Sequence, residues 1–314
     1  MKNYADADYI HARIAAMRSR LLAGRDYAVL VREQMSASAS APGNTLLDRE
    51  ALFREQIAPV IAIAGAYAPY TPLFVAFLRL YEVQNVKMLL AKAADMMPPE
   101  QWYDIAPHAI VEKELLQKKL TGEDLRSLFA GTYLASCFAG AFAPRRMAIR
   151  LDLCAAANLY NAACLLDGQA QREFQDVALK RVAVLTLLWS SRLQTYYSAR
   201  DEQLASLLEK FQAFFSGPAS AQVRLLEEAL ARYADERQKS TGQKPSPIDI
   251  ERYLERFFYA WISSMFHRDF HSLYGVAAYL WLLFYQIQNL YRIRDGRRFG
   301  LSAEAVLDAL FCEA

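Results

Sequence analysis

Two histidines near the C-terminal end of the chain come closest to a metal-binding pattern. His267 and His271 are four positions apart, so a helix would place both on one face, where a zinc ion could reach them. A zinc site needs a third protein ligand, and Asp269 would point to a different face of that helix. The spacing therefore indicates surface or packing histidines, and we predict no metal site.

Motifs for phosphate binding and for hydrolysis do not occur in the chain. The glycines form neither Gly-x-x-x-x-Gly-Lys nor Gly-x-Gly-x-x-Gly, and no Gly-x-Ser-x-Gly turn is present. The Asp-Asp-x-x-Asp run of prenyl-diphosphate enzymes and the Glu-x-x-His motif of di-iron bundles are also missing. Glu227 and Glu228 lie on an amphipathic stretch, where a solvated face explains them. We predict a chain without catalytic residues or cofactors.

The cysteines show no pattern of a disulfide framework or of a metal site. Cys137, Cys154, Cys164 and Cys312 form no Cys-x-x-Cys pair and have no histidine at metal spacing. We predict free thiols that pack as small hydrophobic groups, as in a reducing cytoplasm. Residues 1–6 lack the apolar core of a signal peptide, so the sequence gives no support for export.

Composition and charge exclude some classes of protein. The 314 residues are 54% hydrophobic and 22% charged, with a net charge of +2, which fits neither a disordered chain nor a general polyanion binder such as a nucleic-acid-binding protein. Basic residues gather in two places, which include Arg145, Arg146, Arg297 and Arg298. They are candidates for contact with an acidic partner or lipid headgroups, and an ordinary solvated surface is the alternative.

Hydrophobic spacing predicts helices over most of the chain. In segment 10–22 the apolar residues recur at helical intervals: Ile10, Ile14, Met17 and Leu21. Similar stripes occur in segments 204–215, 223–233 and 250–265. No run of alternating β-branched residues bounded by turns appears, so we predict an all-α fold.

Three features mark the course of these helices. Thr121 precedes a helical pattern and is a candidate N-cap. Segment 235–249 is rich in polar residues and is predicted to be an exposed connector. The uncharged stretches 57–78, 127–144 and 270–291 are long enough to cross a bilayer, but their prolines, hydroxyls and amides favour helices buried in a bundle.

A six-residue phrase occurs twice. Segments 81–86 and 285–290 share Tyr, Gln and Asn at the same places and start 204 positions apart (285 − 81). The polar and aromatic members are Tyr81, Glu82, Gln84, Asn85, Tyr285, Gln286, Gln288 and Asn289. A spacing far beyond any helical period indicates a duplicated structural unit, with convergence as the alternative. A third, weaker copy at 180–188 has Ala183 in the asparagine position, and we predict three units: 1–107, 108–210 and 211–314.

The repeated phrase and both ends of the chain resemble one protein family. Segment 81–90, Tyr-Glu-Val-Gln-Asn-Val-Lys-Met-Leu-Leu, is similar to the signature of the C subunit of bacterial and archaeal vacuolar-type rotary ATPases, which is called the d subunit in eukaryotes. Segment 9–22 resembles the start of that family, and segment 279–301, which includes Gly296, resembles its end. Gln286 departs from the family's acidic residue, and Lys180 and Ala183 depart from its acid and asparagine in the middle unit.

This resemblance implies a funnel of three similar helical domains around a pseudo-threefold axis. It also implies a non-catalytic adaptor that links the central stalk of the ATPase head to the membrane proteolipid ring and transmits torque for proton or sodium transport. Such a protein is peripheral, at the cytoplasmic face of the membrane, and has no transmembrane segment of its own. An all-α enzyme of the terpene-synthase type and an unrelated helical scaffold are the alternatives. In the adaptor we expect Asn85 and Asn289 to be structural residues rather than ligands or catalysts.

Overall fold

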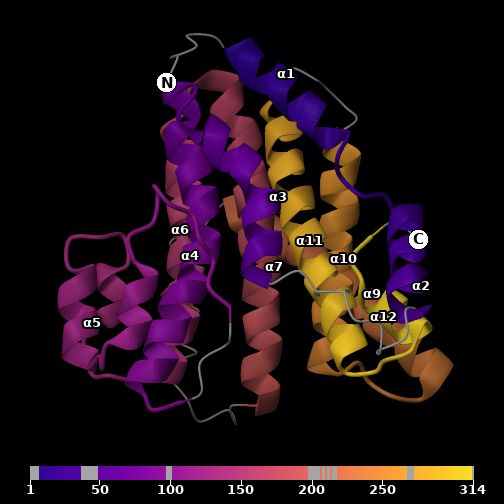
Figure 1. The fold of residues 1–314 in the computed structure, drawn as a ribbon. Coiled ribbons are helices and arrows are strands. Elements are labelled where there is room, and N and C mark those ends of the chain that lie inside the picture. Colours follow the sequence, from indigo (N-terminus) through magenta and orange to yellow (C-terminus); the bar gives the residue numbers. More distant parts are fainter. Residues whose placement is uncertain are drawn as a thin grey trace. The chain divides into compact units, whose positions relative to one another are not determined.

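The computed structural model describes residues 7–36, 49–96, 101–196, 206, 209–210, 213, 218–266 and 272–312. These residues form helices joined by turns and loops and contain no strand, so the predicted all-α class is confirmed (Figure 1). The chain divides into two compact units. Unit 1 combines residues 1–68 with 256–314, and unit 2 is residues 69–255. The division into three units of about equal length stays a prediction.

Unit 1 is built around one long helix from the C-terminal part of the chain. Its helices are α1 (Ala7–Arg18), α2 (Gly24–Ser36), α3 (Arg49–Ala64), the later turns of α10 (Pro247–Phe266), α11 (Leu273–Arg298) and α12 (Ala303–Ala309). Helix α11 contacts α1, α2, α3 and α12. It is therefore buried on most of its sides, which explains why its sequence is apolar almost all round.

Helix α1 forms as the hydrophobic spacing predicts. Ile10, Ile14 and Met17 are buried on one side of the helix. Leu21 lies three residues beyond the last helical residue and is half-buried. The exposed residues Ala12 and Arg13 lie on the other side, so α1 is an amphipathic helix that buries one apolar stripe.

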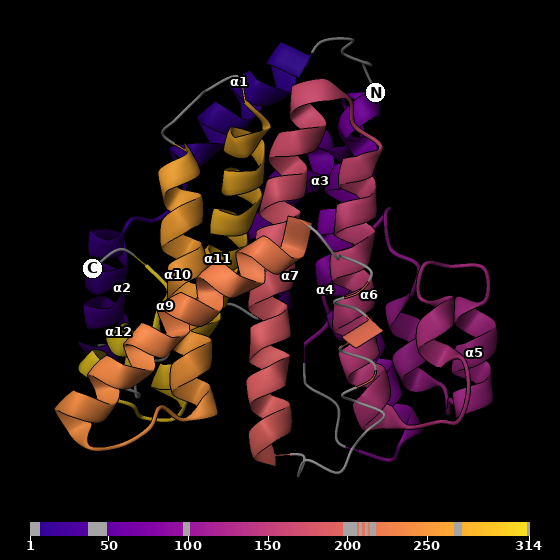
Figure 2. The ribbon, with the colours of Figure 1, turned by 180° about the vertical axis from the view of Figure 1, so that it is seen from behind.

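Unit 2 is a series of helices in which neighbours along the chain pack together. Its elements are α4 (Thr71–Ala93), η2 (Lys113–Gln117), α5 (Gly122–Phe129), η3 (Ala135–Phe138), α6 (Pro144–Cys164), α7 (Gly168–Tyr196), α9 (Pro218–Thr241) and the first turns of α10. Helix α4 packs on α6, α6 on α7, and α7 on α9. Figure 2 shows α9 running obliquely to α7.

The predicted N-cap at Thr121 is confirmed. The Thr121 hydroxyl accepts from the backbone N–H of Asp124, and the Asp124 carboxylate accepts from the backbone N–H of Thr121. This reciprocal arrangement satisfies N–H groups that have no partner inside the helix. The hydrogen bonds from Thr121 also lower the pKa of Asp124.

The prediction of a polar connector over 235–249 is wrong in its extent. Helix α9 continues to Thr241 and α10 begins at Pro247, so only residues 242–246 connect them. Residues 234–239 are Ala, Asp, Glu, Arg, Gln and Lys, and most of these are good helix formers even when exposed to water. An ion pair of 3.0 Å between Arg237 of α9 and Asp249 of α10 links the two helices across this connector.

The described parts of stretches 57–78 and 270–291 contribute many residues to the packed interior, but the prediction of a buried helix is wrong for 127–144, where Ser127, Gly131 and Phe142 are exposed. Within the described residues, no helix combines the length and the apolar character that a bilayer crossing requires. Segment 127–144 is not one helix, because it contains the end of α5, all of η3 and the first residue of α6. The described parts of the other two stretches lie mainly in α3, α4 and α11.

Candidate functional site

The first copy of the repeated phrase lies on α4 and binds the chain that follows this helix. The Asn85 side chain donates from Nδ2 to the carbonyl oxygen of Tyr103 and accepts at Oδ1 from the Tyr103 N–H, both at 2.8 Å. Asn85 is buried. A side-chain amide can pair with one peptide group in this two-way manner because it carries a donor and an acceptor. Asn85 therefore anchors a segment 18 positions further along.

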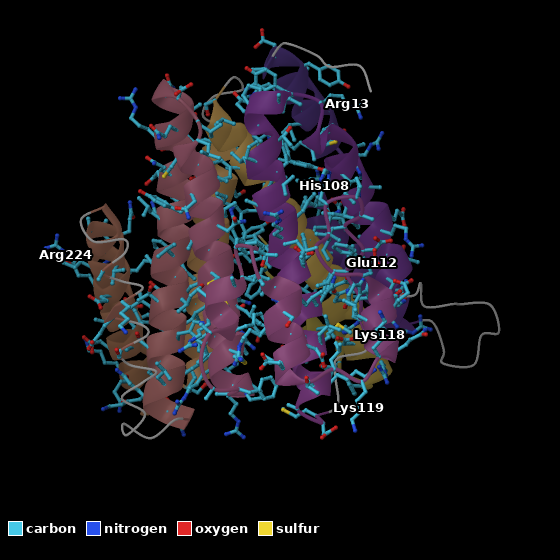
Figure 3. All side chains as sticks on the ribbon, turned by 90° about the vertical axis from the view of Figure 1, so that its left-hand side faces the viewer. Arg13, His108, Glu112, Lys118, Lys119 and Arg224 are labelled. Atoms are coloured by element: carbon cyan, nitrogen blue, oxygen red, sulfur yellow. The ribbon has the colours of Figure 1, made fainter. Side chains whose placement is uncertain are left out.

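Glu82 extends this anchor by one turn of α4. Its buried Oε1 accepts from the backbone N–H groups of Ile110 and Val111, whereas Oε2 has no hydrogen-bond partner. Burial raises the pKa of Glu82, and the two N–H groups and the nearby Arg79 oppose this shift. Asn85 and Glu82 together hold segment 101–111 along α4. Figure 3 labels His108 of this segment and, further on, Glu112, Lys118 and Lys119.

The second copy lies on α11 and makes the same kind of anchor. Asn289 Nδ2 donates to the carbonyl oxygen of Phe311 at 2.6 Å, and the Phe311 N–H donates to Asn289 Oδ1 at 2.8 Å. The anchored residue is 22 positions further along. Asn289 also interacts with the side chain of Tyr27, which belongs to α2, and this interaction opposes the effect of burial on the pKa of Tyr27. Asn289 thus joins three parts of unit 1.

Gln286 takes the place of Glu82 in the second copy but has different partners. Its Oε1 accepts from the backbone N–H of Leu22 at 2.7 Å, and its Nε2 donates to Gln56 Oε1 at 2.6 Å. An amide can serve both partners, whereas an ionised carboxylate could only accept. This explains how Gln286 fits at a position where the resemblance leads one to expect an acid.

The aromatic residue of each phrase packs on the residue that the asparagine holds. The Tyr81 ring lies 5.7 Å from the Tyr103 ring, and the Tyr285 ring lies 5.4 Å from the Phe311 ring. Aromatic pairs at such distances contribute beyond the area that they bury. The remaining members of the phrase, Gln84 and Gln288, are half-buried.

The middle copy offers no comparable anchor. Ala183, at the asparagine position, is buried in α7 and has no polar side-chain atom. The ion pair beside it is formed by Arg181, whose guanidinium is 2.7 Å from the Glu255 carboxylate. The structure therefore places the asparagine anchors in α4 and α11 only, among the three positions that the repeat predicts.

The candidate partner contacts lie at the ends of helices. Arg145 and Arg146 are in the first turn of α6, where Arg145 is exposed and Arg146 is half-buried. Arg297 and Arg298 are in the last turn of α11. Arg297 donates to Gln34 Oε1 at 3.0 Å, and the exposed Arg298 lies over the ring of Phe299. Arg145 and Arg298 are thus the more accessible member of each pair.

Unit 1 contains a small pocket. It has a volume of about 150 Å³, and its lining includes Arg18, Leu22, Tyr27, Tyr259 and Gln286. The segment that joins α1 to α2 forms one wall. Arg18 and Leu22 come from segment 9–22 and Gln286 comes from the repeated phrase, but no pattern in the sequence indicated that they meet at a pocket.

Metal ligands do not gather in the part of the chain that the structure describes. No group of three or more histidine, cysteine or acidic side chains there could hold a metal ion. The pair His267 and His271, with Asp269, lies outside the described residues. Glu227 and Glu228 are exposed on α9.

Comparison with known families gives a match over most of the chain. The family described as ATP synthase (C/AC39) subunit matches residues 48–308, which include α3 to α11 and both copies of the phrase. No curated protein matches the chain. The family match confirms the resemblance to the C subunit of the V/A-type rotary ATPases. The chain therefore belongs to the ATP synthase (C/AC39) subunit family.

Proposed function

We propose that this chain is a non-catalytic adaptor in the central rotor of a V/A-type ATPase or ATP synthase. It would join the central stalk of the soluble head to the membrane proteolipid ring and transmit torque for proton or sodium transport. The observation that carries this proposal is the family match over residues 48–308. The adaptor would work as a peripheral protein at the cytoplasmic face of the membrane, and it would bind no nucleic acid.

The interior of both units supports a mechanical role. A protein that transmits torque must resist deformation, and close-packed protein interiors have low compressibility. Helix α11 buries Tyr279, Trp281 and Tyr285, and Phe258 packs on the last two. The anchors of Asn85 and Asn289 add directional bonds to this packing, because each fixes a loop to a helix through two hydrogen bonds.

We also propose that residues 1–107, 108–210 and 211–314 are three related helical units around a pseudo-threefold axis, which together form a funnel. The matching anchors of Asn85 and Asn289 support a common origin of residues 1–107 and residues 211–314. An experimental structure of the assembled rotor tests this arrangement. Superposition of the helices around Asn85, Ala183 and Asn289 should give rotations near one third of a turn; unrelated rotations would refute the threefold arrangement.

Co-expression with the partner proteins tests the adaptor role. The tagged chain should retain both the central-stalk proteins and the proteolipid ring after purification in detergent. Removal of the chain should separate head from ring and abolish ATP-driven ion transport. Failure to bind either partner would contradict the proposal.

Charge reversal tests the candidate contacts within this experiment. Arg145→Glu and Arg298→Glu should weaken binding to an acidic partner surface. Arg13→Glu and Arg224→Glu are matched controls, because both are exposed arginines on helices and lie outside the two basic groups (Figure 3). Equal loss of binding in all four variants would point to a general charge effect and against specific contacts.

A further inference from the structure

Two cysteine sulfurs lie close together in unit 2. Cys137 in η3 and Cys154 in α6 are 17 positions apart, and Cys137 Sγ donates a hydrogen bond to Cys154 Sγ over 2.9 Å. A disulfide bond is about 2.05 Å long. Both cysteines are free thiols, so the sulfurs need to approach each other by only about 0.9 Å for a bond to form.

The surroundings of the pair favour the thiolate on Cys154. The Ser136 hydroxyl lies 3.6 Å from Cys154 Sγ, and Arg150 precedes Cys154 by one turn of α6. The hydrogen bond from Cys137 lowers the pKa of Cys154; burial opposes this shift, and Ser136 and the Arg150 charge add smaller contributions that lower the pKa further. The same hydrogen bond and burial raise the pKa of Cys137. A thiolate is the nucleophilic form of cysteine.

Exposure to solvent also differs between the two cysteine residues. Cys137 is completely buried, whereas Cys154 is partly exposed. An oxidant from solution can therefore reach Cys154 first, and the Cys137 sulfur already lies 2.9 Å from the Cys154 sulfur. This is the arrangement of a reactive cysteine next to a resolving cysteine.

We propose that Cys137 and Cys154 are a reversible oxidation site, at which hydrogen peroxide converts the two thiols into an intramolecular disulfide. In the first step the Cys154 thiolate attacks one peroxide oxygen, an S–O bond forms, the O–O bond breaks, and the hydroxide that leaves becomes water by taking up the proton that Cys154 released to solution when it formed the thiolate. In the second step the Cys137 sulfur attacks Cys154 Sγ, the S–S bond forms, the S–O bond breaks, and the Cys137 proton leaves with the oxygen in a second water. The two sulfurs lose two electrons and the peroxide gains them.

The disulfide would join η3 to α6 and would affect α5, which contacts η3. Phe138, next to Cys137, stacks on Phe129 of α5 with ring centroids 4.6 Å apart. Arg126 of α5 donates to the carbonyl oxygens of Phe138 and Gly140. A covalent bond from Cys137 to α6 would therefore fix both η3 and α5 to that helix. This chemistry requires no partner protein and does not depend on the proposed adaptor role.

The other two cysteines provide internal controls. Cys164 is exposed and its sulfur accepts from Gln175 Nε2 at 3.2 Å, and Cys312 is half-buried in unit 1. The sulfurs of Cys137 and Cys154, by contrast, are 2.9 Å apart. Exposure alone would favour Cys164, so its reactivity distinguishes the pair from general oxidation.

Peptide mapping after peroxide treatment tests the site. The reduced full chain is treated with a small excess of hydrogen peroxide, blocked with an alkylating reagent and digested. We expect a linked peptide pair containing Cys137 and Cys154, with a mass lower by two hydrogen atoms, to appear before Cys164 or Cys312 is modified. Dithiothreitol should restore both thiols. Oxidation of Cys164 without any link between Cys137 and Cys154 would overturn the proposal.

Single variants assign the two roles. Cys137→Ser should leave Cys154 as a sulfenic acid that a dione reagent traps, and Cys154→Ser should leave Cys137 reduced. Cys164→Ser should form the bridge at the rate of the unmodified chain. If Cys137 oxidises in Cys154→Ser as fast as in the unmodified chain, Cys154 is not the reactive thiol and the mechanism is wrong. Circular dichroism of each variant shows whether it is folded, and the unmodified chain supplies the decisive result even if a variant does not fold.

Discussion

The anchors on α4 and α11 each use an asparagine, but the residue one turn before the asparagine differs between the two helices. In α4, Glu82 accepts from two successive backbone N–H groups of a loop. In α11, Gln286 accepts from the N–H of Leu22 and donates to the side chain of Gln56. The asparagine pairs with a peptide group in both helices, so it can stay the same. The residue three positions earlier has different partners in the two helices, so it is an acid in α4 and an amide in α11.

The two anchors also differ in burial. Phe311, the partner of Asn289, is buried, whereas Tyr103, the partner of Asn85, is half-buried. Asn289 additionally contacts Tyr27. An unpaired polar group costs more where water cannot reach it. The second anchor should therefore contribute more to stability than the first.

Asn289→Leu should have the largest effect. The variant keeps a similar volume but leaves the N–H and C=O of Phe311 unpaired in the interior, which should lower the free energy of unfolding by about 3 kcal/mol. Chemical denaturation measures this change, and hydrogen exchange at the Phe311 amide should show a local loss of protection. Gln288→Ala, one residue away and half-buried, is the control and should change stability by less than about 0.5 kcal/mol.

Asn85→Leu should have a smaller effect of the same kind. Water can replace part of the lost pairing at the half-buried Tyr103, so we expect a loss of about 2 kcal/mol. Loss of exchange protection should centre on residue 103, and Gln84→Ala serves as the control. A loss equal to or greater than that of Asn289→Leu would show that burial of the partner does not set the difference between the anchors.

Gly296→Ala tests a close approach that α11 has and α4 lacks. A Cβ at position 296 would lie 2.3 Å from Cγ2 of Val306, so the Val306 side chain or α12, which carries it, would have to shift. The crowding should cost about 2 kcal/mol, and the better helix propensity of alanine should offset about 1 kcal/mol of it. Lys92 has the same offset from Asn85 and is half-buried, so Lys92→Ala should be near neutral in the same denaturation assay.

Glu82→Gln should change how the stability depends on pH, whereas the stability at acidic pH should change little. Burial raises the pKa of Glu82 above its ordinary value of 4.5, so the folded state holds this proton more tightly than the unfolded chain does. The contribution of Glu82 to stability is therefore complete below pH 4.5 and is lost as the pH rises through the raised pKa.

Glutamine does not titrate, so this loss should be absent from the variant. Denaturation curves at a series of pH values should show the unmodified chain weakening relative to Glu82→Gln as the pH increases. Gln286→Glu should introduce the same kind of fall into unit 1. Parallel pH profiles for the unmodified chain and Glu82→Gln would contradict the role of burial at this carboxylate.

Local sequence predicted much of the secondary structure. The spacing of Ile10, Ile14 and Met17 indicated α1, and Thr121 marked the start of α5. These features depend on residues three or four positions apart, which a helix brings together whatever the rest of the chain does. The end of α9 was misplaced because a polar composition was interpreted as a loop, although residues such as Glu236 and Lys239 favour helix when exposed.

The order of the motifs was enough to indicate the family, whereas only the tertiary structure showed which residues contact one another. The sequence alone identified Asn85, Asn289 and the relationship to the rotary ATPase family, since these depend only on residue types and spacing. It could not show that Asn85 holds Tyr103 or that Cys137 meets Cys154 across 17 positions. Such pairs form where the chain returns to a helix after a loop, and that return is set by the packing of the whole unit rather than by any local pattern.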